Sequence, residues 1–305
     1  MRHLQTYRFV DAVARAGSIR GAAESLAITP SALNRRILAL EDDLGVAVFE
    51  RLTHGVRLSA AGEILIHHIR SQLSDMERVR SQLADLEGAR RGHVSIACSE
   101  GVVARFLPVV VGRYREEYPG VTFTTHLRDR GAIGDALADH SADLAVVFEP
   151  LARADAVRML AVPQTIHAVV SEDHPLAGSS LVRLRECLAH PIAVATERHG
   201  VRALLEMAAV RAGLPFVPVM ESDSFEFLSA SIRDSALVGF QLPLALFPVD
   251  GPADCSLPGL WACPIDQRDI AAGSLQVLQL RGRRLSVAAG RFADRLTRSL
   301  DAHYE

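Results

Sequence analysis

The chain has 305 residues, of which 49% are hydrophobic and 23% charged, and its formal net charge is −3. This composition supplies apolar surface for two or three folded units, and it excludes a protein that binds nucleic acid through bulk positive charge. Any DNA contact must therefore come from one segment. The N-terminus has no apolar core of the kind that signal peptides carry. The longest charge-free apolar stretch, 235–249, is too short to span a bilayer, so we expect a cytoplasmic protein that does not enter membranes.

The four cysteines, Cys98, Cys187, Cys255 and Cys263, form no CxxC pair. We expect reduced, buried thiols, and a redox pair of Cys255 and Cys263 is the alternative. The sequence has no G-x-S-x-G, no H-E-x-x-H and no dinucleotide-binding glycine fingerprint, and it lacks the lysine of a P-loop. We therefore expect no enzyme, no cofactor and no metal site.

Three short helical patterns open the chain. The first ends at Gly17. Ser18 is a good N-cap for a second helix that runs through Leu26. Thr29 caps a third helix that starts with Pro30, continues to Leu44 and stops at Gly45. Two short helices joined by about three residues predict a helix-turn-helix.

The third helix has two distinct faces. Its apolar stripe has the spacing four, three and four and consists of Leu33, Ile37, Leu40 and Leu44. The opposite face carries Ser31, Asn34 and Arg35. The segments 46–49 and 52–58, around His54-Gly55, predict a short β-hairpin.

Residues 59 to about 90 form one long helical pattern. Seven positions with alternating spacings of four and three form a seam, and six of the seven are apolar. They are Leu65, Ile69, Gln72, Met76, Val79, Leu83 and Leu86. This pattern favours a coiled coil with a partner helix, and packing on the helix's own domain is the alternative.

From His93 onward, apolar strand-like runs alternate with amphipathic helices, which indicates α/β folding. The order of strands and helices predicts mainly parallel sheets. Ligands of such folds bind at the carboxyl ends of the strands, near helix N-termini.

The motifs of the first 62 residues occur in an order that is highly specific. They are Ser18-Ile-Arg-Gly-Ala-Ala-Glu-Ser-Leu26, Thr29-Pro-Ser-Ala-Leu-Asn-Arg-Arg-Ile37, Leu40-Glu-Asp-Asp-Leu-Gly45, Val48-Phe-Glu-Arg51 and Leu58-Ser-Ala-Ala-Gly62. This stretch resembles the DNA-binding domain of LysR-type transcription regulators. Similar residues in the later part, Tyr118-Pro119, Asp143-Leu-Ala145 and His174-Pro-Leu-Ala177, extend the resemblance more weakly. The chain departs from the family pattern at Pro30 and Asn34, so the resemblance leaves the operator sequence open.

The resemblance implies a fold of three parts. An N-terminal all-α winged helix-turn-helix would occupy 1–58, and a linker and dimerisation helix with a hinge would occupy 59–92. An α/β two-lobed effector domain like periplasmic binding proteins would occupy 93–305. Lobe I would comprise 93–161 and 267–305, and lobe II would comprise 162–266.

The expected function is a sequence-specific bacterial transcription regulator controlled by a small-molecule effector. The recognition helix would lie in the major groove. Base contacts are assigned to Ser31, Asn34 and Arg35, whereas Thr29 caps the helix and reaches a phosphate. The remaining phosphate or minor-groove candidates are Arg36, Arg51 and Arg57, and Arg36 alternatively pairs with Glu41 or Asp42 on the surface.

Four residues are the effector-site candidates, by topology and by the resemblance: Ser99, Phe148, Thr196 and Ser224. The alternative for each is an ordinary cap residue or core aromatic. The expected partners are double-stranded operator DNA, an unidentified small molecule, and further copies of the chain in a homodimer and a homotetramer. Two other functions stay open: a constitutive DNA-binding dimer with a vestigial pocket, and a solute-binding protein.

Overall fold

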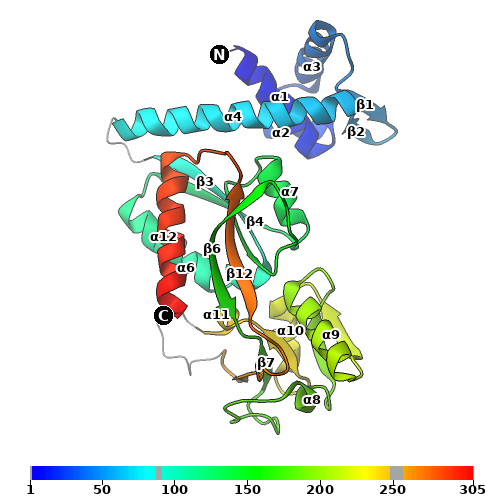
Figure 1. The fold of residues 1–305 in the computed structure, drawn as a ribbon. Coiled ribbons are helices and arrows are strands. Elements are labelled where there is room, and N and C mark those ends of the chain that lie inside the picture. Colours follow the sequence, from blue (N-terminus) through cyan, green and yellow to red (C-terminus); the bar gives the residue numbers. More distant parts are fainter. Residues whose placement is uncertain (1, 87–90, 248–256, 305) are drawn as a thin grey trace.

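The protein is described by a computed structural model that covers residues 2–86, 91–247 and 257–304. Figure 1 shows a small N-terminal unit at the top, the long helix α4 beneath it, and a two-lobed α/β domain below α4. The helix α4 thus lies between the N-terminal unit and the larger domain.

The N-terminal unit has three helices and a hairpin. These are α1 (Arg2–Ala16), α2 (Ile19–Ser25), α3 (Pro30–Leu44), β1 (Phe49–Leu52) and β2 (Gly55–Leu58). The predicted caps are confirmed, because Ser18 accepts a hydrogen bond from Gly21 N–H, and Gly45 ends α3 with a left-handed φ of 70°. In the apolar stripe of α3, Leu33 and Ile37 are buried, whereas Leu44 at the helix end is exposed.

The predicted hairpin exists, but its first strand is β1, later in the sequence than the segment 46–49 that we expected. Its place is fixed by contact with the loop after α1. Val56 N–H donates to the Gly17 carbonyl at 2.8 Å. A Cβ on Gly55, whose φ is +102°, would lie 2.3 Å from the same oxygen. Only glycine fits this approach, so the wing is held against the helices by its own backbone.

Glu41 connects the end of α3 to the wing. Its Oε1 accepts hydrogen bonds from Val48 N–H at 2.7 Å and from Phe49 N–H at 3.0 Å. The sequence alone suggested Glu41 only as a surface partner of Arg36. That alternative is wrong for Glu41, because its carboxylate accepts hydrogen bonds from two backbone N–H groups.

Helix α4 (Ala60–Leu86) begins where Ser59 Oγ accepts a hydrogen bond from Gly62 N–H at 3.0 Å. The expected helix start is confirmed, and residues 87–90 lie outside the described part of the chain. Gly62 has a steric role, since a Cβ there would lie 2.1 Å from the Val48 carbonyl oxygen. The helix can therefore pass the wing strand only with glycine at this position.

We expect Gly62→Ala to lower the free energy of unfolding of the N-terminal unit by about 1–3 kcal/mol or more, because backbone must move to admit the methyl group. Urea denaturation measures this change. Gly21→Ala in α2 is the matched control, since its Cβ would meet neighbours only at 3.8–3.9 Å. The control is expected to keep or slightly raise stability, because alanine favours a helix more than glycine does. Equal stability of Gly62→Ala and wild type would contradict the steric role.

The predicted seam of α4 divides into two halves. Ile69 is fully buried in the core of the N-terminal unit, and Leu65 packs against that core, so the prediction of Ile69 as a seam residue is wrong. Val79 and Leu83 are exposed by 38% and 56%, as is Ile64 by 77%. The alternative of packing on its own domain therefore holds for the first turns of the helix. The three residues Ile64, Val79 and Leu83 form an exposed apolar face.

Lobe I is built on a five-stranded sheet with the order β4-β3-β5-β12-β6. Its elements are β3 (Gly92–Cys98), α5 (Glu100–Val103), α6 (Phe106–Glu117), β4 (Val121–Leu127), α7 (Ala132–Ala138), β5 (Leu144–Phe148), β6 (Ala156–Gln164), β12 (Gly273–Leu280) and α12 (Val287–Tyr304). The helical segment after β3 is interrupted at residues 104–105, between α5 and α6. The side chains of Tyr114 and Phe292 pack edge to face, which joins α6 to the C-terminal helix α12.

Lobe II contains a three-stranded sheet, β10-β7-β11, and a two-stranded sheet, β8-β9. Its elements are β7 (His167–Ser171), α8 (Leu184–Cys187), β8 (Ile192–Ala195), α9 (Gly200–Ala212), β9 (Pro218–Ser222), α10 (Phe225–Ile232), β10 (Gly239–Gln241), α11 (Pro243–Leu246) and β11 (Leu260–Pro264). The chain crosses between the lobes at 165–166 and again at 265–272.

The prediction of mainly parallel sheets is wrong. Strands β3, β4 and β5 pair in parallel, as do β8 and β9, but β12 pairs antiparallel with both β5 and β6, and β7 pairs antiparallel with β10 and β11. The reason is topological. The chain passes between lobes in the extended pairs β6–β7 and β11–β12, and strands that return without a crossover helix enter a sheet antiparallel.

Three cysteines are buried, and burial raises the pKa of Cys98 and Cys187 to about 12 and of Cys263 to about 11. These thiols are therefore un-ionised at neutral pH. Cys255, the other member of the suggested redox pair, lies outside the described residues. Within the described ranges, no helix combines the length and hydropathy that crossing a membrane requires.

Candidate DNA interface and effector cleft

The N-terminal turn of α3 presents polar side chains outward. Thr29 Oγ1 accepts a hydrogen bond from Ala32 N–H at 3.3 Å, which confirms its cap role. Ser31 and Arg35 are exposed and Asn34 is half-buried. The positive end of the helix dipole lies at this turn, and it attracts phosphate oxygens. This face therefore offers both base-reading side chains and a helix N-terminus.

The wing and the recognition helix are connected by a hydrogen bond between two of the predicted DNA-contact residues. Arg51 Nη2 donates to Asn34 Oδ1 at 3.2 Å. The amide oxygen has a second lone pair and its NH2 group is still available, so Asn34 retains the donor and acceptor that an adenine edge requires. The contact also restricts the rotamers of Asn34 before it meets DNA.

The two remaining arginines of the predicted interface have partners within the unit. The Arg36 guanidinium lies over the ring of Phe9, 5.3 Å from its centroid. Across the hairpin, Arg57 pairs with Glu50 through Nε at 2.8 Å and through Nη2 at 2.7 Å. Both arginines are exposed. An exposed pair of this kind is weak, so a DNA phosphate can compete with Glu50 for Arg57.

A second candidate site lies between the two lobes. An inner pocket of about 20 Å³ and an outer pocket of about 300 Å³ share four lining residues: Arg128, Asp129, Arg198 and His199. The first two follow β4 of lobe I, and the last two follow β8 of lobe II. The cleft thus lies at the carboxyl ends of parallel strands, where the α/β pattern predicts a ligand.

Two of the four predicted effector residues line the inner pocket, namely Ser99 and Phe148. Phe148 is only 3% exposed. A Cβ on Gly273 would lie 2.3 Å from its ring, and a Cβ on Gly200 of lobe II would lie 2.6 Å from its carbonyl oxygen. Phe148 therefore fills the junction of the two lobes, and close backbone contact there depends on two glycines.

The other two predicted residues, Thr196 and Ser224, line neither pocket. Thr196 donates a hydrogen bond to Asp223, and Ser224 caps α10 by accepting from Phe227 N–H at 3.2 Å. The Thr196 hydroxyl is thus used within lobe II, whereas the Ser224 hydroxyl caps α10 and also bonds to Glu100 of lobe I.

The arginines at the mouth of the cleft were missed by the sequence analysis. Arg128 directly follows β4, the parallel neighbour of β3, and Arg198 follows β8. The signal was present, because both stand where strands end. Burial lowers the pKa of His199, and the nearby Asp223 partly opposes that effect. His199 Nε2 lies 3.6 Å from Asp223 Oδ1.

Glu100 forms a direct hydrogen bond between the lobes. Its Oε1 accepts from Phe225 N–H, at the start of α10, at 2.9 Å. Burial raises the pKa of Glu100 despite this hydrogen bond and that from Ser224, and the like charges of Asp223 and Glu226 raise it further. Because folding raises the pKa of the Glu100 carboxyl, its ionised form is less favourable in the folded chain than in the unfolded chain. At neutral pH, Glu100 therefore lowers the free energy of unfolding of the two-lobed domain.

We expect Glu100→Gln to raise the thermal midpoint of the domain at about pH 7, because the amide oxygen still accepts from Phe225 N–H and no charge is buried. The gain stays below about 1 kcal/mol, since water screens a partly exposed carboxylate. The gain should disappear below about pH 4, where the carboxyl is protonated in both folded and unfolded chains. Glu116→Gln, an exposed change on α6 that is not among the charges acting on Glu100, is the control and should not raise the midpoint. A gain that is independent of pH would contradict the role of the buried charge.

Comparison with known protein families covers both parts of the chain. The model of the bacterial regulatory helix-turn-helix protein, lysR family, matches residues 4–63, and the LysR substrate binding domain matches residues 87–301. The chain belongs to the LysR family of bacterial transcription regulators. Its N-terminal unit is the family's DNA-binding domain, and its two-lobed domain is the family's effector-binding domain.

Relatives agree over most of the chain. A probable nitrogen assimilation transcriptional activator from Synechococcus elongatus is 25% identical over 225 residues, which covers 73% of this chain and 72% of that protein. Full-length OxyR from Pseudomonas aeruginosa, crystallised as a single-residue variant, superposes with a TM-score of 0.71 and 18% identity, covering 97% and 94% of the two chains. CbnR complexed with its target DNA gives a TM-score of 0.66 and 17% identity, with coverage of 97% and 99%.

This LysR-family chain is therefore a DNA-binding transcription regulator whose activity is modulated by a small-molecule effector. The expected fold of a winged helix-turn-helix, a linker helix and a two-lobed effector domain is confirmed.

Proposed function

We propose that the chain reads operator DNA with the outward face of α3 and the wing. The hydrogen bond from Arg51 to Asn34 carries this proposal, since it joins helix and wing into one surface of exposed donors. Ser31, Asn34 and Arg35 contact base edges in the major groove, whereas phosphates are met by Thr29, Arg36, Arg51 and Arg57. Residues 1–58 carry only two more arginines than acidic residues. DNA binding therefore depends on where the arginines lie and not on the net charge of the unit.

We further propose that two chains pair through the exposed apolar face of α4, formed by Ile64, Val79 and Leu83. An apolar stripe of this kind on a long helix is buried by a second helix. The dimer doubles the phosphate contacts and requires half-sites about 34 Å apart, or a multiple of that distance. The functional units are then 1–58, 59–92 and 93–305. The expected lobe boundaries, with lobe I at 93–161 and 267–305 and lobe II at 162–266, are corrected by β6, which extends to Gln164 in the sheet of lobe I, so the chain crosses between lobes at 165–166 and 265–272.

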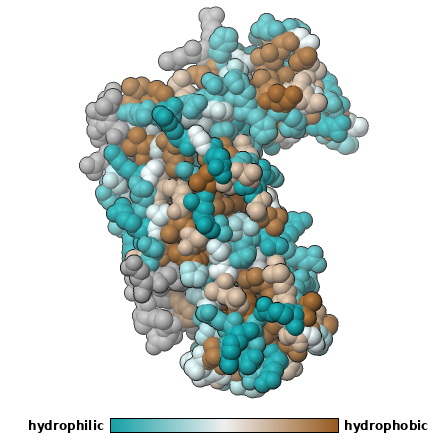
Figure 2. Space-filling model, viewed as in Figure 1, coloured by the Kyte–Doolittle hydropathy of each residue, from teal (hydrophilic) through white to brown (hydrophobic). Residues whose placement is uncertain are grey.

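The same reasoning supports a tetramer. Figure 2 shows apolar surface over the lobe that contains α9 and α10. The exposed apolar side chains in this region are Met207, Val210, Val217, Val219 and Phe227. We propose that this surface joins effector domains of different dimers. Exposed apolar side chains on neighbouring elements favour a surface that another chain covers.

The effector in this proposal is a small molecule with an anionic group, bound in the outer part of the cleft. The acids there are engaged: Glu100 by Phe225 N–H, Asp223 by Thr196, and Asp129 by the N–H groups of residues 131 and 132. Arg128 and Arg198 are exposed at the mouth and remain available for a carboxylate. A ligand that touches both lobes changes DNA binding only through its preference for one arrangement.

One observation favours the constitutive alternative. The inner pocket of about 20 Å³ holds at most about one water molecule, because Phe148 fills the junction of the lobes. In that case the cleft is vestigial, and the dimer binds its operator with equal affinity whatever small molecules are present.

Thermal unfolding of the full chain with a panel of small carboxylates tests the effector proposal. We expect at least one compound to raise the midpoint of wild type and of Arg185→Ala, an exposed arginine elsewhere in lobe II. The same compound should have a much smaller effect on Arg198→Ala. If the compound raised the midpoint of Arg198→Ala as much as that of wild type, the proposed site at the mouth of the cleft would be wrong. If no compound raised the midpoint of wild type, the constitutive alternative would be favoured.

A further inference from the structure

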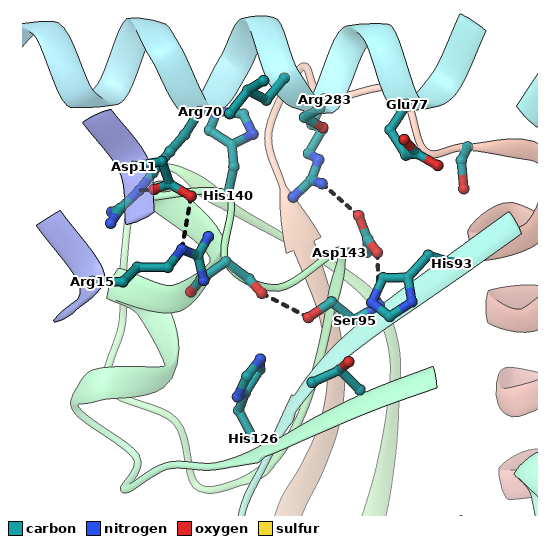
Figure 3. Close-up of a pocket in the computed structure, with 15 residues that line it drawn as sticks. Asp11, Arg15, Arg70, Glu77, His93, Ser95, His126, His140, Asp143 and Arg283 are labelled. Carbon is teal, nitrogen blue, oxygen red and sulfur yellow. Dashed lines mark hydrogen bonds and ion pairs between the residues drawn. The ribbon is translucent and has the colours of Figure 1, made fainter. Parts of the chain in front are cut away.

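A third polar pocket lies between the DNA-binding unit, the linker helix and lobe I. Its volume is about 330 Å³, and its walls come from α1, α4, β3, β4 and the segments before β5 and α12. Figure 3 shows Arg15 on the α1 side, His126 on the opposite wall from α4, and Arg283 beneath α4. The pocket shares no lining residue with the effector cleft, although His126 lies near the end of β4, two residues before Arg128 of the cleft.

Arg70 of α4 forms one edge of this pocket and connects three parts of the molecule. Its Nε donates to Asp11 of α1 at 2.8 Å, and its Nη1 donates to Asp139 after α7 at 2.7 Å. Only 14% of the Arg70 side chain is exposed. Hydrogen bonds between a guanidinium and carboxylates are strong and directional when water is largely excluded. Arg70 therefore holds the DNA-binding unit against lobe I in a defined orientation.

Two of the pocket's acids are already neutralised by arginines. Asp11 accepts from Arg15 Nε at 2.8 Å as well as from Arg70. Asp143 accepts from Arg283 Nη2 and, at 2.8 Å, from Ser95 N–H. These carboxylates therefore do not offer a site for a cation.

Donors, in contrast, remain without partners. Arg283 Nε is buried and has no hydrogen-bond partner, although the side chain is only 8% exposed. An arginine Nε–H can only donate, and leaving such a donor unpaired costs free energy. His140 Nδ1 is also buried without a partner, and in a neutral ring it donates in one tautomer and accepts in the other. Burial and the adjacent Arg283 lower the pKa of His140 to about 4, so its ring is neutral.

The pKa of His126, on the wall of the pocket opposite α4, is set by burial and by nearby charges. Burial lowers its pKa, and so do the positive charges of Arg128 at the end of its own strand and of Arg15 on α1. His93 on β3 acts in the same direction, and Asp139 opposes it. A negative charge placed between Arg15 and His126 would reverse this effect and favour a protonated ring.

We propose that this pocket binds a small molecule through an oxyanion group, sulfate-like or phosphate-like, held by Arg15, His126 and Arg283. The oxyanion supplies acceptors for the unpaired donors. The volume also leaves room for a small organic body beside the charged group. Because Arg15 belongs to the DNA-binding unit and His126 to lobe I, the bound molecule favours the docked arrangement of the two. The pocket is thus a second effector site, and it acts on the DNA-binding unit directly.

Inorganic sulfate is the probe, since its charge does not change between about pH 6 and pH 8. Isothermal titration of the full chain is done at constant ionic strength with chloride as the reference salt. We expect saturable binding with an affinity that increases as the pH falls, by up to about tenfold per pH unit for the uptake of one proton. Arg15→Gln and His126→Gln should each weaken binding by about tenfold or more, the effect of losing one charge-assisted hydrogen bond.

Two variants separate this site from the effector cleft. Arg298→Gln, an exposed change on α12, should bind sulfate like wild type, and so should Arg198→Gln at the mouth of the cleft. Loss of sulfate binding in Arg198→Gln with retention in Arg15→Gln would overturn the proposal, because sulfate would then occupy the cleft. Absence of saturable binding at about pH 6 would also overturn it. Neither result depends on DNA, so failure here leaves the proposed DNA interface untouched.

Discussion

The double substitution Val79→Asp, Leu83→Asp in α4 is expected to convert the protein into monomers and to lower its operator affinity by about 100-fold or more. Each buried aliphatic side chain contributes about 1.5–3 kcal/mol, and the two-fold pairing of α4 would bury four of them. Carboxylates at the same positions would face each other without partners. A monomer holds one half-site only. Sedimentation velocity measures the assembly state, and fluorescence anisotropy with operator DNA measures the affinity.

Glu77→Gln is the matched control, because it changes a charge on α4 at an exposed position on the face opposite Val79 and Leu83. It should leave both measurements close to wild type. Val79→Ala, Leu83→Ala should give an intermediate dissociation constant for the dimer, since part of the apolar area remains. A double-aspartate protein that sediments like wild type would contradict pairing through this face of α4.

The second large effect is expected for Arg35→Ala, which should weaken operator binding by about 10- to 100-fold for each half-site that the arginine no longer reads. A forked arginine interaction with guanine discriminates by about 1–3 kcal/mol, and the proposed dimer contains two such residues. Binding to unrelated DNA should change much less, because it depends on phosphate contacts. Anisotropy titrations with operator and scrambled duplexes measure both effects.

Arg298→Ala, which removes an exposed arginine from α12, is the control and should bind both duplexes like wild type. If Arg35→Ala weakened binding to operator and to scrambled DNA equally, Arg35 would be a phosphate contact, and base recognition would have to be reassigned to Ser31 and Asn34.

Local signals in the sequence were sufficient for the DNA-binding unit. Side-chain caps at Ser18 and Thr29 and the left-handed Gly45 are decided by neighbours within a few residues, so they can be inferred without knowing the fold. The first wing strand was placed too early because the apolar run 46–49 ends at Phe49, where β1 begins. The position of the wing depends on the Val56 hydrogen bond to Gly17, which joins residues that are distant in the sequence.

The larger domain was less predictable. Strand β6 has no clear signal in the sequence, because it is an edge strand with a mixed burial pattern and because Pro163 interrupts the strand pattern. Whether strands pair in parallel or antiparallel depends on where the chain crosses between the lobes. No local sequence pattern indicates those crossings. The first half of the α4 seam was misassigned because burial of Ile69 against its own domain and burial against a partner require the same apolar side chain.

Candidate site residues were predicted in part. Topology indicated the strand ends that border the cleft, but it did not indicate which side chains are used locally, as Thr196 is by Asp223. The third pocket was not predictable, because it brings together Asp11, Arg70, Asp139 and Arg283, which are far apart in the sequence. Their proximity results from the docking of two folded units.

The most direct test of this account is the affinity of the purified full chain for DNA from its own promoter region, measured with a scrambled control across a salt series. We predict a protected site with two half-sites about 34 Å apart or a multiple of that distance, and an affinity that falls steeply with salt. We also predict a clear preference over scrambled DNA at every salt concentration. Equal affinity for both duplexes throughout the series would contradict recognition of an operator by α3 and the wing.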